Sequence, residues 1–198
     1  MSQTKQNPNH FSSPLCLSNW LQSRLPSDSF SSWGIKPGTK NVHNLWLELS
    51  EGETSLIDST PPIRTVHVVS VRIIDENGRI LLESHQELSD GTQRERNRPL
   101  SEKMKPNETV EDAVVRAVKE ELGSIIRVSS IENDVNSTVK IKTGSYQKKV
   151  EERVSVSYPG LPACYVLHSV DASVEGLPDE EFCTEDEEYS ECSVAEVA

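Results

Sequence analysis

Two neighbouring glutamates, Glu120 and Glu121, follow an apolar periodic segment and precede Gly123. In the last turn of a helix they would oppose the helix macrodipole, at a cost of roughly 0.3–1 kcal/mol each. A divalent cation would offset this cost, because Mg²⁺ accepts one or two carboxylates and keeps its other positions for water and phosphate oxygens. The pair therefore indicates a cation site beside a phosphate-bearing ligand. The alternative is a frayed helix end, where Glu121 reaches water and Arg116 and Lys119 soften the charge.

The helix that carries the pair is predicted between Thr109 and Gly123. Thr109 and Asp112 form a T-x-x-D capping box, which makes Thr109 the expected N-cap. Gly123 suits the left-handed residue that ends a helix. The apolar residues between them follow the i, i+3, i+4 spacing of one stripe: Val110, Ala113, Val114, Ala117, Val118 and Leu122. At about 100° per residue Glu121 falls within this stripe, so we expect a desolvated carboxylate there.

The segment PNETVEDAVVRAVKEELG resembles the Nudix box, G-x5-E-x7-R-E-U-x-E-E-x-G-U, in which U is a bulky apolar residue. The matching residues are Glu108, Arg116, Val118, Glu120, Glu121 and Gly123. IIDENGRILLE and PLSEKMKP, which precede the box, are similar to the two strands and the L-P-G-G-K loop of that family. The resemblance covers roughly residues 62–170 and implies an α/β fold, a Nudix-like α/β/α sandwich with a mixed, partly antiparallel sheet.

The box is degenerate. Its opening glycine is Glu102, Ser101 replaces the glycine before it, and Ser124 replaces the last apolar residue. The glutamate that should follow Arg116 is Ala117. The resemblance implies that this glutamate binds the metal or activates water, and a methyl group can do neither.

Members of the family hydrolyse a diphosphate linked to another moiety, with Mg²⁺ or Mn²⁺. By this resemblance Glu120 and Glu121 would hold the Mg or Mn ion, and the backbone carbonyl of Ser101 would add a ligand. Glu151 and Glu152 are candidates for a catalytic base, with Glu152 preferred; the alternative is a charged hairpin edge. Loss of a general base slows a reaction roughly 10²–10⁴-fold.

We therefore expect weak or lost hydrolysis of a nucleoside- or isoprenoid-linked diphosphate. The alternative is a non-catalytic Nudix-fold binding module or scaffold subunit. The expected ligand is a small molecule that contains a diphosphate.

Basic residues crowd the segment before the helix, which we interpret as a loop over residues 85–105. They are Arg94, Arg96, Arg98, Lys103 and Lys105. In the Nudix fold this loop borders the cleft, so these side chains could clamp phosphates. An exposed polar loop that also holds Asp90, Glu95 and Glu102 is the alternative.

All three tryptophans, Trp20, Trp33 and Trp46, precede residue 47, which indicates a packed extension over residues 14–50. We expect these aromatic rings to form a core, and a protein partner binding through residues 14–50 is the further possibility. HNLWLEL (43–49) alternates as a strand does, and residues 54–64 look like a linker. Further strands are predicted over 64–75, 79–84, 125–131, 137–142, 150–158 and 163–170.

Acidic residues are concentrated near the C-terminus: residues 171–198 hold eleven acids and no Lys or Arg, against a formal net charge of −12 for the chain. The expected organisation is an N-terminal extension and linker (1–60), a Nudix-like domain (61–178) and an acidic tail (179–198). A tail of this charge would repel a phosphate backbone, so no direct nucleic-acid contact is expected.

No apolar run approaches the roughly 20 residues that span a bilayer, so we expect a soluble protein without membrane contact. The four cysteines, Cys16, Cys164, Cys183 and Cys192, contain no C-x-x-C pair. We expect reduced thiols that are mostly buried or incidental, which suits a reducing compartment such as the cytoplasm. Residues 1–27 hold six serines and no acid, so a chloroplast or mitochondrial transit peptide is the alternative.

Overall fold

The computed structural model describes residues 10–87, 91, 93–126, 138–186 and 191–197. These residues form two compact units, which are described separately. Unit 1 comprises the residues up to Val68, Lys103–Asn107 and Lys149–Leu167, and unit 2 comprises Val69–Glu102, Glu108–Lys148 and the residues from His168 on.

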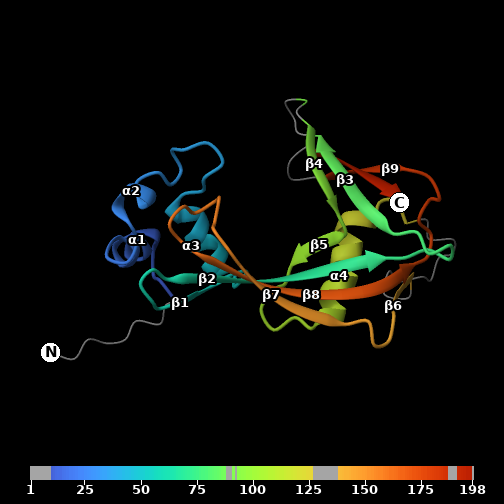
Figure 1. Ribbon diagram of the computed structural model, residues 1–198, viewed down its shortest axis with the longest axis horizontal. Helices are drawn as coiled ribbons and strands as arrows, with labels where there is room; N and C mark the ends of the chain where they lie inside the picture. Colours follow the sequence, from blue (N-terminus) through green and yellow to red (C-terminus); the bar gives the residue numbers. More distant parts are fainter. Residues whose placement is uncertain (1–9, 88–90, 92, 127–137, 187–190, 198) are drawn as a thin grey trace. The chain divides into compact units, whose positions relative to one another are not determined.

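The expected α/β class with a mixed sheet is confirmed (Figure 1). The helices are α1 (Pro14–Gln22), α2 (Ser27–Phe30), α3 (Val42–Ser50) and α4 (Val110–Leu122). The strands are β1 (Ser55–Ile57), β2 (Ile63–Ile73), β3 (Leu81–Glu87), β4 (Gln93–Arg98), β5 (Leu100–Lys103), β6 (Val139–Ile141), β7 (Gln147–Arg153), β8 (Ala163–Val174), β9 (Phe182–Asp186) and β10 (Glu191–Val197). One sheet has the order β1-β2-β8-β6, with β5 paired to β2 and β7 paired to β8, and a second has the order β4-β3-β10-β9.

The core of unit 1 is built from the N-terminal aromatic residues, as predicted. Trp20 and Trp33 are each 7% exposed, and Phe11 packs edge-on against Trp20 with ring centroids 5.5 Å apart. The indole of Trp33 lies 5.0 Å from the ring of Tyr158, and its N–H donates to the carbonyl of Pro159 at 2.8 Å. Residues 14–50 are therefore a folded part of unit 1.

The strand predicted over 43–49 is wrong, because this segment is the helix α3. Asn41 and Asn44 form a reciprocal capping box at its start: each side chain accepts the other's backbone N–H at 3.0 Å. The buried side chains follow helical spacing, with Leu45 and Leu49 facing the core and Leu47 37% exposed. Local capping and a 3.6-residue period outweighed an alternation that spans only seven residues.

The linker predicted over 54–64 is also wrong. Strand β1 pairs antiparallel with the start of β2, so that Leu56 lies opposite Arg64. Leu56 is 2% exposed and belongs to the core of unit 1. A three-residue strand gives too short an alternation to be read from sequence.

Strand β2 changes its buried set along its length. In unit 1 the buried residues are Arg64 and Val66, whereas in unit 2 they are Val69, Val71 and Ile73. Because side chains of a strand alternate with a period of two, even-numbered and odd-numbered residues lie on opposite faces, so the buried face of β2 changes between Val66 and Val69. The predicted strand is confirmed, and the single strand β2 contributes its first residues to unit 1 and its last residues to unit 2.

In unit 2, the helix α4 contacts β6 of the first sheet and β9 of the second. The loop predicted over 85–105 is wrong, since the end of β3, β4 and β5 together occupy most of it. Asn97 has a φ of 44°, and the β3–β4 register shifts between Glu83 and His85, which marks an irregularity in the hairpin.

The acidic segment after residue 178 forms β9 and β10, and β10 pairs with β3. The strand predicted over 125–131 lies mostly outside the described residues. That over 150–158 corresponds to β7 only up to Arg153. Cys183 is exposed, and Cys16 and Cys164 are half-buried.

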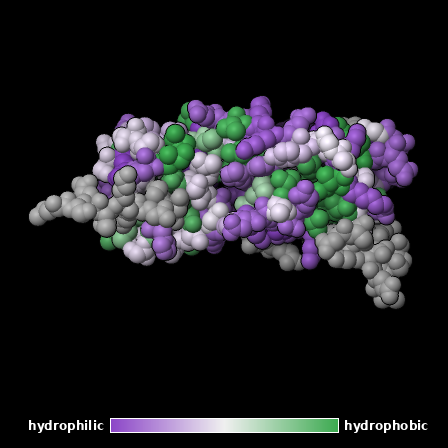
Figure 2. Space-filling model, turned by 90° about the horizontal axis from the view of Figure 1, so that it is seen from below, coloured by the Kyte–Doolittle hydropathy of each residue, from purple (hydrophilic) through white to green (hydrophobic). Residues whose placement is uncertain are grey.

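Within the described part of the chain, no helix has the length and apolar character that crossing a membrane requires. Hydrophilic and hydrophobic residues are interspersed over the face of the molecule drawn in Figure 2.

Candidate active site

The helix α4 begins as predicted. The side chain of Thr109 accepts the backbone N–H of Asp112 at 3.1 Å and donates to the Asp112 carboxylate at 2.8 Å. Gly123, however, has φ −59°, so the left-handed cap expected there is wrong. The chain continues in a right-handed turn, and a Cβ at this position would lie 2.3 Å from the carbonyl oxygen of Lys119. Close approach to the helix, not backbone handedness, requires the glycine.

The apolar stripe of α4 is buried as expected, and Ala117 is 0% exposed. The paired glutamates, Glu120 and Glu121, are both exposed, so the desolvated carboxylate predicted at Glu121 is wrong. A helical wheel gives the direction of a side chain but not whether another element covers it. Glu121 is exposed although Leu122, the next residue, is buried.

Arg116 organises the box by ion pairs. Its guanidinium donates to both carboxylate oxygens of Glu108, at 2.7 and 3.0 Å, and to Glu120 at 2.8 Å. The hydrogen bonds that Arg116 donates to Glu108, followed by the one to Glu120, raise the pKa of Arg116 against the opposing effect of burial. The carboxylate of Asp112, one turn before Arg116, instead accepts from the hydroxyl of Thr109. The sequence motif had marked Glu108 without giving it this role.

The two ion pairs of Arg116 should differ in strength. The side chain of Glu108 is only 10% exposed, whereas that of Glu120 is 46% exposed. Arg116→Met is expected to lower the free energy of unfolding by about 1–3 kcal/mol, because the half-buried bidentate partner of Glu108 is lost. Glu120→Gln should change it by less than about 0.5 kcal/mol, since an exposed i,i+4 pair is weak. Urea unfolding measures both, and equal losses would contradict this ranking.

Ser101 lies in β5 within unit 2 and is half-buried. Its hydroxyl donates to the carbonyl of Pro99 at 3.0 Å. Its own carbonyl remains the candidate ligand that the resemblance implies.

Most of the basic residues that were predicted to clamp phosphates lie on strands, not in a loop. Arg94, Arg96 and Arg98 lie on β4, and the last two meet Glu83 of β3, with Nε–Oε distances of 3.6 and 2.8 Å. Burial, and then the neighbouring Arg98, lower the pKa of Arg96, whereas Glu83 raises it. Lys103 belongs to unit 1 and donates to Glu53 at 2.9 Å. Arg94 is exposed.

The candidate base, Glu152, is exposed on β7 in unit 1. Its neighbour Glu151 accepts from Lys149 at 2.7 Å and from Arg153. Two cations lower the pKa of Glu151 through hydrogen bonds, Lys149 first and Arg153 second.

A comparison with protein families adds to this geometry. The family model described as NUDIX domain matches residues 64–197, which is more than half of the chain. The chain belongs to the NUDIX domain family. The match runs through β9 and β10, so the family resemblance extends past the acidic residues that follow β8. A comparison with curated proteins found no match.

The Nudix box offers few side-chain ligands for a metal ion. Among the described residues, no group of three or more His, Cys, Asp or Glu side chains is arranged to hold one. Glu120 and Glu121 therefore offer two carboxylates at most. Such a pair fits Mg²⁺ only if water and ligand phosphates complete the coordination, which is how this ion is commonly bound beside phosphates.

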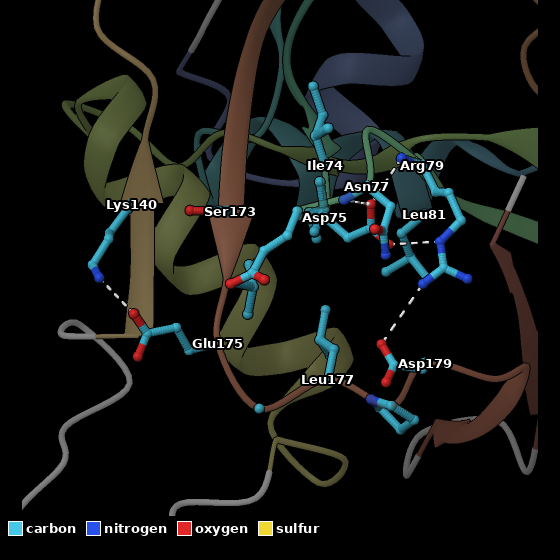
Figure 3. Close-up of a pocket in the computed structure, with 15 residues that line it drawn as sticks. Ile74, Asp75, Asn77, Arg79, Leu81, Lys140, Ser173, Glu175, Leu177 and Asp179 are labelled. Atoms are coloured by element: carbon cyan, nitrogen blue, oxygen red, sulfur yellow. Dashed lines mark hydrogen bonds and ion pairs between the residues drawn. The ribbon is translucent and has the colours of Figure 1, made fainter.

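A cavity of about 550 Å³ lies elsewhere in unit 2 of this Nudix protein, beside the turn between β2 and β3 and the end of β8. Figure 3 shows Arg79 reaching from that turn between Asp75 and Asp179, and Lys140 paired with Glu175. Four acids and two bases line the cavity, and both bases are paired. This balance disfavours a diphosphate, and no residue of the Nudix box lines the cavity.

A buried carboxylate that the sequence analysis missed lies in unit 1. Glu48 of α3 is 6% exposed and accepts from Arg64 at 2.7 Å, Lys40 at 2.8 Å and the Tyr158 hydroxyl at 3.0 Å. Burial alone would raise the pKa of Glu48, but the charge of Arg64 and the hydrogen bond from Lys40 outweigh it and lower the pKa to about 2. Burial, and then the charge of Glu48, raise the pKa of Tyr158. The network ties α3 to β2 and to the segment before β8.

Tyr158 and His168 are both buried. Tyr158 is 0% exposed, and His168 is 9% exposed with Nδ1 3.0 Å from the Tyr146 hydroxyl. The signal that could have found Glu48 is its i+3 spacing from Leu45, which places it on the buried face once α3 is recognised as a helix.

Proposed function

We propose that this chain is a Nudix hydrolase-like protein in which Mg²⁺- or Mn²⁺-dependent hydrolysis of a nucleoside- or isoprenoid-linked diphosphate is weak or lost. The observation that carries the proposal is Ala117, which is fully buried at the position where the box has a glutamate. A methyl group there can neither hold a second cation nor accept a proton from water.

In this proposal one cation arrives with the phosphates of the ligand. Glu120 and Glu121 would bind it, together with the carbonyl of Ser101. Glu120 can leave Arg116 at little cost, because an exposed pair of this kind contributes only about 0.3–0.5 kcal/mol. Glu108 keeps Arg116 in place during the exchange, since its two hydrogen bonds are more deeply buried.

The remaining roles follow the same proposal. The basic side chains would neutralise the phosphates; these are Arg94, Arg96, Arg98 and Lys103. For Arg96 and Arg98 the ligand competes with Glu83, which limits affinity. Glu152, which is exposed on β7, is the proposed base.

A non-catalytic binding or scaffold subunit is the second candidate. It is favoured by exposed apolar side chains on the folded N-terminal part of unit 1, where Leu15 is 69% and Ile35 is 80% exposed. A protein partner would cover such residues, whereas a hydrolase does not need them.

Release of phosphate-containing product from a panel tests the proposal: ADP-ribose, NADH, diadenosine phosphates, coenzyme A and isoprenyl diphosphates, each with Mg²⁺ or Mn²⁺. We expect slow or no turnover by the natural chain, and a rate at least about 10²-fold higher in Ala117→Glu, provided that circular dichroism shows this variant folded. Any turnover of the natural chain should vanish in Glu121→Gln.

Fast turnover by the natural chain would contradict the proposal, because typical enzymes reach roughly 1–10³ s⁻¹. If a folded Ala117→Glu variant releases no product although calorimetry still detects ligand binding, the result would favour the binding subunit.

A further inference from the structure

Strand β7 lies at an edge of the first sheet. It pairs with β8, beside which it runs in Figure 1, and no other described strand pairs with it. All of its residues are exposed except Glu151, which is half-buried. The backbone N–H and C=O groups on the outer side of such a strand are a template for a further strand.

The sequence of β7 is complementary to itself. Its centre reads KKVEE, with Lys148 and Lys149 before Val150 and Glu151 and Glu152 after it. If two copies run antiparallel about Val150, each Lys149 faces Glu151 of the other copy, and each Lys148 faces Glu152. Cross-strand pairs of opposite charge stabilise an antiparallel sheet, and like charges directly opposite each other destabilise it.

We propose that β7 is the interface of a symmetric homodimer, in which two copies of this chain join their first sheets by antiparallel pairing of β7 about a two-fold axis at Val150. A two-fold interface requires that residue i meet residue j and that j meet i, which the KKVEE pattern satisfies at every position. Val150, 57% exposed, meets its own equivalent at the centre.

A second copy fits this edge better than an unrelated strand. An unrelated partner would need the same order of charges, whereas the chain supplies that order itself. The five central residues carry two positive and two negative charges, so the edge escapes the repulsion expected between copies with a net charge of −12. In the single chain Lys149 forms an ion pair with Glu151 of its own strand. In the dimer each Lys149 would form this ion pair with Glu151 of the other copy instead. Val154 and Val156, 88% and 79% exposed, directly follow the strand.

Charge exchange tests the proposal on the full chain. One variant is Lys148→Glu/Lys149→Glu, and the other is Glu151→Lys/Glu152→Lys. Sedimentation velocity over a concentration series should give a dimer for the natural chain. Each variant alone should dissociate at least about tenfold more readily, because every ion pair becomes a like-charge pair. A one-to-one mixture of the two variants should restore a dimer, now of unlike copies.

The controls separate pairing from folding. Lys36→Glu, an exposed change in unit 1 outside β7, should leave the dimer intact. Circular dichroism and thermal unfolding should show every variant folded. A monomeric natural chain at all concentrations would overturn the proposal, since the charges would then serve only to protect the edge. Dimers that persist in both charge variants, or a mixture that stays monomeric, would overturn it as well.

Discussion

Glu48→Leu is expected to lower the free energy of unfolding by about 3–5 kcal/mol, because it removes one partner of a buried ion pair and leaves the other in place. Arg64 is 5% exposed, and its Nε already lacks a hydrogen-bond partner among the described residues. After the substitution its charge would remain buried without Glu48 at 2.7 Å. Tyr158, with no exposure, would lose the acceptor of its hydroxyl. Guanidinium unfolding measures the loss.

The double variant Glu48→Leu/Arg64→Met is the matched control. Replacing both charges by apolar groups of similar size is often neutral or stabilising, so we expect it to recover most of the stability lost in Glu48→Leu. A double variant as unstable as the single one would show that packing around α3, not the uncompensated charge of Arg64, sets the loss.

The same network predicts how stability depends on pH. The pKa of Glu48 is lowered from 4.5 to about 2 in the folded chain. Its contribution, of about 3 kcal/mol, is therefore complete above pH 4.5 and is lost as the pH falls from there toward 2. Glu48→Gln should flatten the stability profile in this window. An unchanged acid profile would contradict the assignment.

Ala117→Glu should be the most destabilising change in the Nudix box when no divalent cation is present. Ala117 is 0% exposed between Ala113, Val114 and Val118, which are equally buried. The larger side chain alone costs about 1–3 kcal/mol, and a desolvated carboxylate adds a similar or larger amount. We expect a total loss of about 3–5 kcal/mol at neutral pH, measured by urea unfolding in EDTA.

Ala117→Met is the control that overpacks the same position without a charge. Burial raises the pKa of an introduced carboxyl, so Ala117→Glu should lose more stability than Ala117→Met as the pH rises through the ordinary carboxyl range. Addition of Mg²⁺ with a diphosphate ligand should restore part of this loss, because binding to the folded state alone stabilises it. Equal stability of Ala117→Glu and the natural chain would contradict the closed packing of Ala117.

Much of the box was readable from sequence because it depends on local physics. The N-cap at Thr109 requires only residues three positions apart, and the buried stripe of α4 requires only the helical period. The starts of β8 and β2 were readable because their alternating apolar residues extend over many positions, although β8 continues past the predicted residue 170 to Val174. The Nudix resemblance itself depends on spacing within one segment, and the family match confirms it.

Other features depend on which of several acids a base binds, or on groups that are distant along the chain. Arg116 binds Glu108, whereas the carboxylate of Asp112 accepts from Thr109. Arg96 and Arg98 meet Glu83 only because β4 pairs with β3. Spacing alone does not reveal which of several competing acids a guanidinium will bind.

The sequence by itself determined the family, the box helix and the missing carboxylate at Ala117, since each is a matter of residue type and local period. Only the tertiary structure decided that Glu48 of α3 is buried, and that Glu121 stands in solvent. Burial depends on which layer covers an element and how far that layer extends, and residues far apart in the chain supply it.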